Sequence, residues 1–304
     1  KGPLSAAELL SPSLAQTKRL STTFYDTHLG RGEEISDYTY NYQSDGATVK
    51  DVQVFYYEGD KRASQATARE ALIRQDLHKT TAINLIVATN RKSSTFFDIH
   101  LGKGDEIADY SANYLADGTT ISTIRVFYYS GGERAAQASD IDVLIRQDTH
   151  KASSIDQIAM TNRKSSTFFE AHLGKGREIS DYTYEYENDG TTVKGVSVFT
   201  YEGDQRAADA NSKSALIRQD NYTANSINSI AVTNRESTTF FDIHLGKGQE
   251  LADYSLNYKF GTTEVESTSV NFYGNDKRAS VATQDDALTV SVSYEGVKEV
   301  RDLD

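Results

Sequence analysis

Stretches in which apolar and polar side chains alternate recur along the whole chain, and turns rich in glycine and aspartate separate them. Residues 35–42, ISDYTYNY, are typical, because Tyr38 and Tyr40 fall on one side of the stretch and Thr39 on the other. Such alternation over about four to eight residues indicates a β-strand with two different faces. The turns, such as Gly-Arg-Gly at residues 30–32, predict hairpins between neighbouring strands. The pattern therefore predicts an all-β protein built from antiparallel strands.

Residues 21–92 contain the first complete set of these stretches and predict five or six strands. The stretches lie at residues 21–29, 34–43, 48–60, 71–76 and 83–92. Residues 62–77 have a composition that also suits a short helix. The equivalent stretches later in the chain alternate more strongly, so strand or irregular structure is favoured over helix there.

The pattern repeats with a strict period of 72 residues. The string FYDTHLGRGEEISDY, which begins at Phe24, returns in related form at Phe96, Phe168 and Phe240. Uniform spacing without insertion is typical of stacked units that keep register with their neighbours, because independent domains on linkers tolerate changes in length. The chain is therefore expected to form one continuous array.

We divide the chain by this period into a partial unit and four repeats. The partial unit, an N-terminal cap, is 1–20, and the repeats are 21–92, 93–164, 165–236 and 237–304, the last with a divergent C-terminal cap. The favoured fold is a tandem-repeat antiparallel sheet array of the β-solenoid or hairpin-strip type. A four-bladed β-propeller, in which each repeat is one blade and the ends interlock, is the alternative.

Composition and charge narrow the range of partners. The chain has 304 residues, with Lys+Arg 32 against Asp+Glu 44 and a net charge of −12. A chain with this excess of acidic residues does not gain the free energy of counterion release that drives nucleic-acid binding, and anionic lipid headgroups repel it. No apolar run approaches the roughly 20 residues of a membrane helix, and the first residues lack the pattern of a signal peptide. We therefore expect a soluble piece of a longer protein, with neither nucleic acid nor membrane insertion.

The tyrosines gather at equivalent positions of the repeats. Equivalent rings on neighbouring strands stabilise a sheet by about 0.2–1 kcal/mol per pair, which favours a packing role. Adjacent residues such as Tyr56 and Tyr57 point to opposite sides of a strand, so one side is expected to be exposed. An exposed row beside carboxylates would suit a carbohydrate or a peptide. The candidate ligand-binding residues are Tyr38, Tyr57, Tyr110, Tyr129, Tyr182, Tyr201, Tyr254 and Tyr273.

One histidine in each repeat precedes a Leu-Gly-Lys/Arg-Gly turn, with carboxylates nearby in sequence. A histidine beside carboxylates can hold a metal ion or act as a general base, but a structural role is favoured over both. The candidate metal ligands are His28, His100, His172 and His244. Aspartates at turns, such as Asp45 and Asp60, leave calcium open as a cofactor. The absence of cysteine excludes disulfides, a thiol nucleophile and Cys-ligated zinc.

Three short motifs of the first repeat occur in a fixed order: the Tyr25-Asp26 pair, the Gly30-Arg31 turn and the later Asp45-Gly46 turn. This order resembles the YD repeat of Rhs-type bacterial proteins, over roughly a third of each repeat. In the later repeats phenylalanine replaces the tyrosine and lysine replaces the arginine. The resemblance implies a large bacterial surface or secreted protein in which hairpins run side by side in a curved sheet or shell.

Together, these patterns predict a non-catalytic structural or adhesive segment of a larger bacterial protein, located outside the cell or on its surface. Neighbouring repeats, another protein or a glycan are the expected partners. A multivalent carbohydrate- or peptide-binding module that uses the tyrosine rows is the alternative. A metal-dependent enzyme at the histidine clusters is disfavoured, because enzymes rarely keep four equal active sites in one array.

Overall fold

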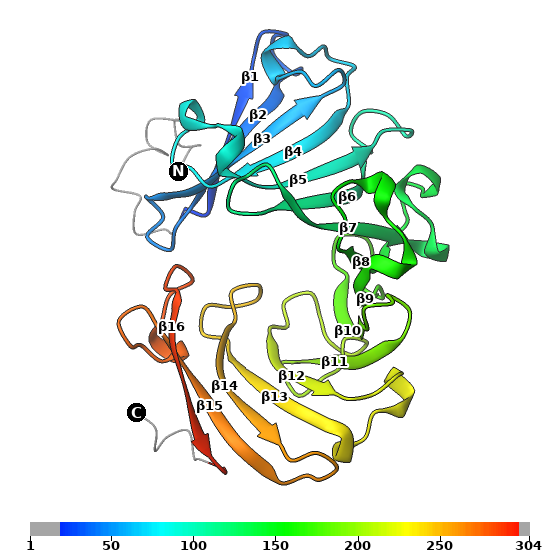
Figure 1. Ribbon diagram of the computed structural model, residues 1–304. Helices are drawn as coiled ribbons and strands as arrows, with labels where there is room; N and C mark the ends of the chain where they lie inside the picture. Colours follow the sequence, from blue (N-terminus) through cyan, green and yellow to red (C-terminus); the bar gives the residue numbers. More distant parts are fainter. Residues whose placement is uncertain (1–18, 298–304) are drawn as a thin grey trace. The chain divides into compact units, whose positions relative to one another are not determined.

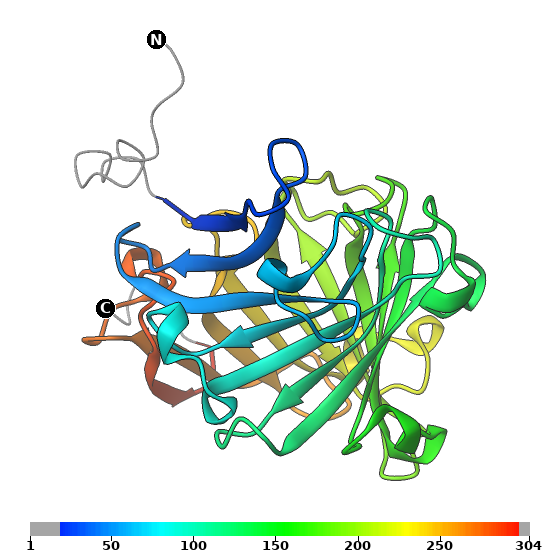
Figure 2. The ribbon, with the colours of Figure 1, turned by 90° about the horizontal axis from the view of Figure 1, so that it is seen from above.

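The computed structural model describes residues 19–297, and there the chain consists of β-strands and short 3-10 helices without an α-helix. Sixteen strands form one sheet in which the strand order is the chain order, from β1 to β16 (Figure 1). The described chain packs as two compact units: residues 19–125, 135–140 and 153–155, and residues 126–134, 141–152 and 156–297. Within each unit, successive strands lie side by side, as the gradual change of colour shows (Figure 2).

The bounds of the elements repeat with the period of the sequence. The strands are β1 Ser21–Asp26, β2 Ile35–Tyr42, β3 Val49–Tyr57, β4 Leu72–His78, β5 Arg91–Asp98, β6 Ile107–Tyr114, β7 Ile121–Tyr129, β8 Leu144–His150, β9 Arg163–Glu170, β10 Ile179–Tyr186, β11 Val193–Tyr201, β12 Leu216–Tyr222, β13 Arg235–Asp242, β14 Leu251–Tyr258, β15 Val265–Tyr273 and β16 Leu288–Glu295. The 3-10 helices are η2 Ala63–Gln65, η3 Ile83–Leu85, η4 Ala88–Asn90, η5 Ser130–Gly132, η6 Ala135–Gln137, η7 Ile155–Gln157, η8 Met160–Asn162, η9 Ile227–Ser229, η10 Val232–Asn234 and η11 Ala279–Val281.

Within residues 19–297, each repeat contributes four strands, so the prediction of five or six is wrong. Residues 83–90, expected to be part of a strand, form the turns η3 and η4 instead. The side chain of Asn90 explains the difference, because it bonds to nearby backbone groups. Its Oδ1 accepts a hydrogen bond from the Val87 amide at 3.3 Å, and its Nδ2 donates to the Leu85 carbonyl at 3.0 Å. An asparagine that binds its own backbone in this way competes with strand pairing.

Residues 62–77 contain no long helix. Only the single turn η2 is helical, and β4 begins at Leu72. The preference for strand or irregular structure over helix in this segment is therefore confirmed.

The sheet continues across the repeat boundaries, which confirms the tandem antiparallel array. At the first boundary, Gln75 of β4 is the register partner of Thr95 of β5, and Leu77 is the partner of Ser93. The pairing of β12 with β13 has the same form at the third boundary. A β-propeller would begin a separate blade at these points, so the propeller alternative is wrong. The compact units divide within β7 and not at a repeat boundary.

One face of the sheet, which we call the apolar face, carries valines and aromatic rings. Val196 and Val198 of β11 are buried there, and the connection between β12 and β13 covers them with Ala224 and Ile227. The hydroxyl of Tyr184 accepts a hydrogen bond from the Ile227 amide at 3.1 Å and anchors this connection. The core of this region therefore lies between the sheet and its own connecting segments.

A buried aspartate between two arginines links the strands at each of the three repeat boundaries. At the third boundary, Asp220 of β12 accepts a hydrogen bond from Arg218 Nε at 2.9 Å. Arg235 of β13 places Nη1 3.5 Å from the Asp220 carboxylate, and its guanidinium lies 4.3 Å from the centroid of the Tyr258 ring on β14. The corresponding groups are Asp76 with Arg74 and Arg91, and Asp148 with Arg146 and Arg163. Each group ties the last strand of one repeat to the first strands of the next.

The opposite face, which we call the polar face, carries hydroxyl and amide side chains in rows that cross the strands. One row of register partners in the second compact unit consists of Gln147, Thr167, Thr183, Ser197, Asn221, Ser237, Asn257, Ser267 and Glu295. Neighbours bond within the row: Thr167 Oγ1 lies 2.9 Å from Thr183 Oγ1. The polar residues at every second position of each strand therefore line up with polar residues on the neighbouring strands and form rows across the sheet.

The turn between β10 and β11 is expected to open in acid. Asp189 accepts hydrogen bonds from the side chain of Thr192 and from the amides of Thr192 and Thr191, which lower its pKa from 3.8 to about 2. A carboxylate with a lowered pKa stabilises the fold fully above pH 3.8 and loses this effect as the pH falls toward 2. We therefore expect the amide NMR signals of Thr191 and Thr192 to shift in this window. A midpoint at an ordinary aspartate pKa would contradict the bonded turn.

Candidate functional site

Four of the eight candidate tyrosines are core residues. Tyr57, Tyr129, Tyr201 and Tyr273 are only 6%, 8%, 6% and 7% exposed. Tyr57 packs against Ile35 and Ala63, and its hydroxyl donates a hydrogen bond to the Ser36 carbonyl at 2.6 Å. Burial raises the pKa of the Tyr57 hydroxyl. The prediction of an exposed ligand-binding row is therefore wrong for these four, because the alanines after each strand fold back over the rings.

The other four candidate tyrosines lie half-buried on the apolar face. Each stacks on a phenylalanine of the preceding strand: Tyr38 on Phe24, Tyr110 on Phe96, Tyr182 on Phe168 and Tyr254 on Phe240, with centroids 4.6, 4.5, 4.7 and 4.7 Å apart. Burial raises the pKa of Tyr182 to about 12. The stacked phenylalanine covers one face of each tyrosine ring, so the main contact of these rings is the one that joins neighbouring strands. A role in ligand binding stays a prediction for them.

Each candidate metal-binding histidine has one carboxylate neighbour, two residues before it. The pairs are His28 with Asp26, His100 with Asp98, His172 with Glu170 and His244 with Asp242. In the second pair, His100 Nδ1 lies 2.6 Å from Asp98 Oδ1, which also accepts a hydrogen bond from the His100 amide at 3.0 Å. Over residues 19–297, no group of three or more His, Cys, Asp or Glu side chains gathers where it could hold a metal ion.

The other carboxylates near these histidines and turns bond to backbone amides or to an arginine. Glu106 accepts a hydrogen bond from the Leu72 amide at 2.9 Å. Asp45 Oδ1 accepts a hydrogen bond from the Ala47 amide at 2.8 Å, and Asp60 Oδ1 lies 2.7 Å from Arg74 Nη1. These contacts close turns and join strands, and calcium binding at the aspartates stays a prediction.

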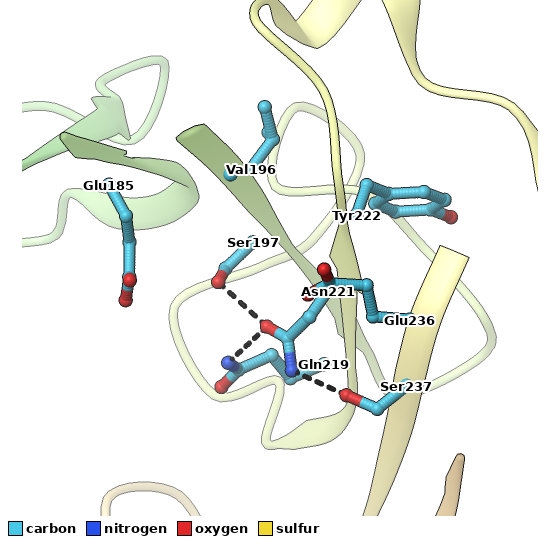
Figure 3. A pocket seen from close by; sticks show the side chains of 9 residues that line it. Glu185, Val196, Ser197, Gln219, Asn221, Tyr222, Glu236 and Ser237 are labelled. Carbon is cyan, nitrogen blue, oxygen red and sulfur yellow. Dashed lines mark hydrogen bonds between the residues drawn. The ribbon is translucent and has the colours of Figure 1, made fainter. Parts of the chain in front are cut away.

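The polar face has a hollow of about 310 Å³ in repeat 3, which the sequence reasoning missed. Its lining residues come from β10 to β13: Glu185, Gly195, Val196, Ser197, Gln219, Asn221, Tyr222, Glu236 and Ser237 (Figure 3). All of them belong to the second compact unit. The hollow therefore lies where four consecutive strands of the polar face meet.

Asn221 is the centre of the hydrogen-bond network in this hollow. Its Oδ1 accepts hydrogen bonds from Ser197 Oγ at 2.7 Å and from Gln219 Nε2 at 2.9 Å. Its Nδ2 donates to Ser237 Oγ at 2.9 Å. Three strands thus hold polar groups in fixed positions, and the side chains of Glu185 and Glu236 lie on either side of them (Figure 3). Such a preorganised polar surface suits a ligand rich in hydrogen-bonding groups.

No helix among the described residues is long and apolar enough to span a bilayer. No protein-family model matches the chain, and no curated protein sequence matches it.

Among solved structures, the chain is similar to one titled "Crystal Structure of TcdB2-TccC3-Cdc42", with 10% sequence identity and a TM-score of 0.17. The match covers 88% of this chain and 16% of that chain. A TM-score of this size carries no argument about fold or function.

Proposed function

We propose that the chain is a non-catalytic repeat segment with a structural or adhesive role in a larger bacterial cell-surface or secreted protein. The observation that carries this proposal is the recurrence of the same contacts between strands at the 72-residue period. Each of the first three repeats has a buried aspartate with two arginines, and all four have a stacked phenylalanine and tyrosine pair. The shared residues therefore hold strands together, which is the role expected of a structural segment.

The repeated contacts also support growth of the sheet by whole repeats. Because Asp220 and Arg235 lie on strands that flank a repeat boundary, each boundary has a stabilising ion pair of its own. In such arrays the stability depends on each repeat and on its contacts with its neighbours. A location outside the cell is supported by the resemblance to YD repeats.

Deletion of residues 93–164 tests this proposal. The deletion joins Lys92 to Ser165 and restores the sequence RKSSTFF, so β4 regains an equivalent neighbour. We expect a folded protein with cooperative urea unfolding and an m-value lower by about a quarter, since m scales with the surface exposed on unfolding.

The matched control removes residues 93–128, half of the period. This deletion joins strands out of register, so we expect aggregation or loss of cooperative unfolding. Equal folding of the two deletions would contradict the proposed repeat structure, and so would failure of the 72-residue deletion to fold.

A multivalent carbohydrate- or peptide-binding role is the second candidate function. The observation that favours it is the polar face, where hydroxyl and amide groups are repeated from strand to strand. Carbohydrate hydroxyls both donate and accept hydrogen bonds, as these side chains do. The polar rows support this role better than the tyrosine rows, half of which are core residues.

A further inference from the structure

Repeat 3 differs from repeats 1 and 2 at one place on the polar face, and the residues that differ line the hollow. Position by position, repeat 1 has Asn41 for Glu185, Asp51 for Gly195, Gln53 for Ser197, Leu77 for Asn221 and Lys92 for Glu236. The residues lie far apart in the sequence of repeat 3 but meet around one cavity. Changes that cluster in space within a regular repeat indicate a local function that the first two repeats lack.

In repeat 1 the equivalent positions form a closed and charge-balanced network. Asn41 Nδ2 donates a hydrogen bond to Asp51 Oδ1 at 2.7 Å, and Lys92 Nζ lies 3.8 Å from Asp51 Oδ2. Gln53 Nε2 donates to Gln75 Oε1 at 2.7 Å. These long side chains satisfy one another and fill the space that Gly195 and Ser197 leave open in repeat 3. A separate hollow of about 660 Å³ lies beside them, lined in part by Leu77, Lys92 and Ser93.

Gly195 opens the space in repeat 3, and the backbone does not require a glycine there. The residue is in an extended strand, and the nearest atom to an added Cβ would be the Tyr222 carbonyl oxygen at 3.4 Å. This is an ordinary van der Waals separation, so a side chain would fit. The short side chain of Ser197, where repeat 1 has Gln53, widens the same opening.

The hollow carries two carboxylates, whereas the charges at the equivalent positions of repeat 1 balance; one of the two, Glu185, lies 3.9 Å from Lys194 Nζ. Glu236 replaces a lysine, and Glu185 replaces an asparagine. Both carboxylates are exposed, and Glu236 also accepts a hydrogen bond from the Thr223 hydroxyl. Carboxylates accept hydrogen bonds and attract cations, so the hollow favours a ligand with positively charged donors. The net charge of −12 disfavours an anionic ligand further.

We propose that the hollow of repeat 3 binds a saccharide that carries ammonium groups, an oligomer of the glucosamine type. The sugar hydroxyls pair with the amides and hydroxyls around Asn221, and the ammonium groups pair with Glu185 and Glu236. The volume of about 310 Å³ is at the lower end of small-ligand sites, which suits one or two sugar rings. This inference narrows the second candidate function to one site and one ligand class.

Isothermal titration calorimetry of the full chain with a β-1,4-linked glucosamine tetramer tests the proposal. At about pH 6 and about 0.15 M salt we expect saturable binding of one ligand per chain. The substitution Glu236→Lys places the residue of repeats 1 and 2 in the site, and we expect at least a tenfold loss of affinity. The triple substitution Gly195→Asp, Ser197→Gln and Glu236→Lys introduces the longer side chains of repeat 1 into the opening at Gly195 and Ser197, and we expect no binding.

Matched controls separate the site from general charge and from loss of fold. The substitution Lys92→Glu places a glutamate at the repeat-1 position that corresponds to Glu236. Asp51, not a glycine, occupies the position of Gly195 there, so the affinity for the saccharide should be unchanged. Circular dichroism should show the same sheet content for every variant, since the grafted residues already occur in this fold.

Three results would overturn the proposal: no saturable binding to the wild-type chain, equal affinity of the triple variant, or spermidine binding as tightly as the sugar with the same response to the variants. The deletion of residues 93–164 tests the structural proposal independently, because it leaves this hollow in place.

Discussion

Replacing Asp220 by alanine is expected to destabilise the sheet by about 3–5 kcal/mol, the cost typical of breaking a buried ion pair. The side chain of Asp220 is 5% exposed, and it holds Arg218 and Arg235 from two neighbouring strands. Thr238 Oγ1 also donates a hydrogen bond to it at 2.5 Å. Without the carboxylate, two guanidinium groups on the apolar face lose their shared partner. Urea unfolding, together with hydrogen exchange of the β12 and β13 amides, measures the loss.

Asp204 provides a matched control, because it pairs with the same arginine at the surface. Its carboxylate is 70% exposed and lies 2.7 Å from Arg218 Nη1. The substitution Asp204→Asn is expected to cost less than about 1 kcal/mol, as exposed ion pairs usually do. Equal losses for the two variants would contradict the structural importance of the buried group.

The substitution Gly190→Ala is expected to destabilise the protein by about 3 kcal/mol or more. Gly190 has a φ of +67°, and an added Cβ would lie 1.9 Å from the Met160 carbonyl oxygen. A left-handed backbone costs a residue with a side chain about 1–2 kcal/mol, and the contact with the backbone of η8 adds to this. The turn between β10 and β11 therefore has to move away from the connection on which it packs.

Gly176→Ala is the control for the backbone conformation alone. Gly176 has a φ of +77°, but no atom lies within 4 Å of the position of its missing Cβ. We expect a loss of about 1–2 kcal/mol, and the difference between the two variants measures the close approach. If urea unfolding shows the same loss of unfolding free energy for both variants, the close packing of the Gly190 turn on η8 is contradicted.

The all-β class and the continuous array follow from two features of the sequence, alternation and period. The number of strands does not follow from them, because residues 83–90 are mostly apolar, as in a strand, but turn on the side chain of Asn90. Local hydrogen bonds of this kind leave the hydrophobic pattern unchanged, so the pattern gives no warning of them. The same applies to η2, where one helical turn precedes a strand.

Alternation also predicts two different faces, but it does not say which rings the connecting segments will cover. Tyr57 and Tyr38 are both aromatic positions on strands, yet Tyr57 is enclosed by Ile35 and Ala63 while Tyr38 stacks at an intermediate depth. The covering residues are small alanines, whose importance depends on how the connections fold back. Packing of this kind is a tertiary effect that a single strand pattern does not contain.

The sequence signal for the hollow in repeat 3 is a difference between the repeats, whereas the tyrosines and histidines are signalled by their recurrence in every repeat. The tyrosines and histidines attract notice because every repeat has them, whereas Gly195 and Glu236 differ from the equivalent residues of the other repeats. A comparison of the repeats with one another reveals these positions. Only the register of β10 to β13 shows that they meet at one place.

Cysteine cross-linking across a repeat boundary tests the continuous sheet most directly, since the natural sequence has no cysteine. Gln75 and Thr95 are register partners on β4 and β5, and such partners have Cα atoms about 4.5–5.5 Å apart, within the range of a disulfide. The variant Gln75→Cys with Thr95→Cys is expected to form an intramolecular disulfide on mild oxidation. The control, Gln75→Cys with Ser111→Cys, places the cysteines two strands apart and should not cross-link. Failure of the first pair, or cross-linking of both pairs, would contradict a sheet that continues from one repeat into the next.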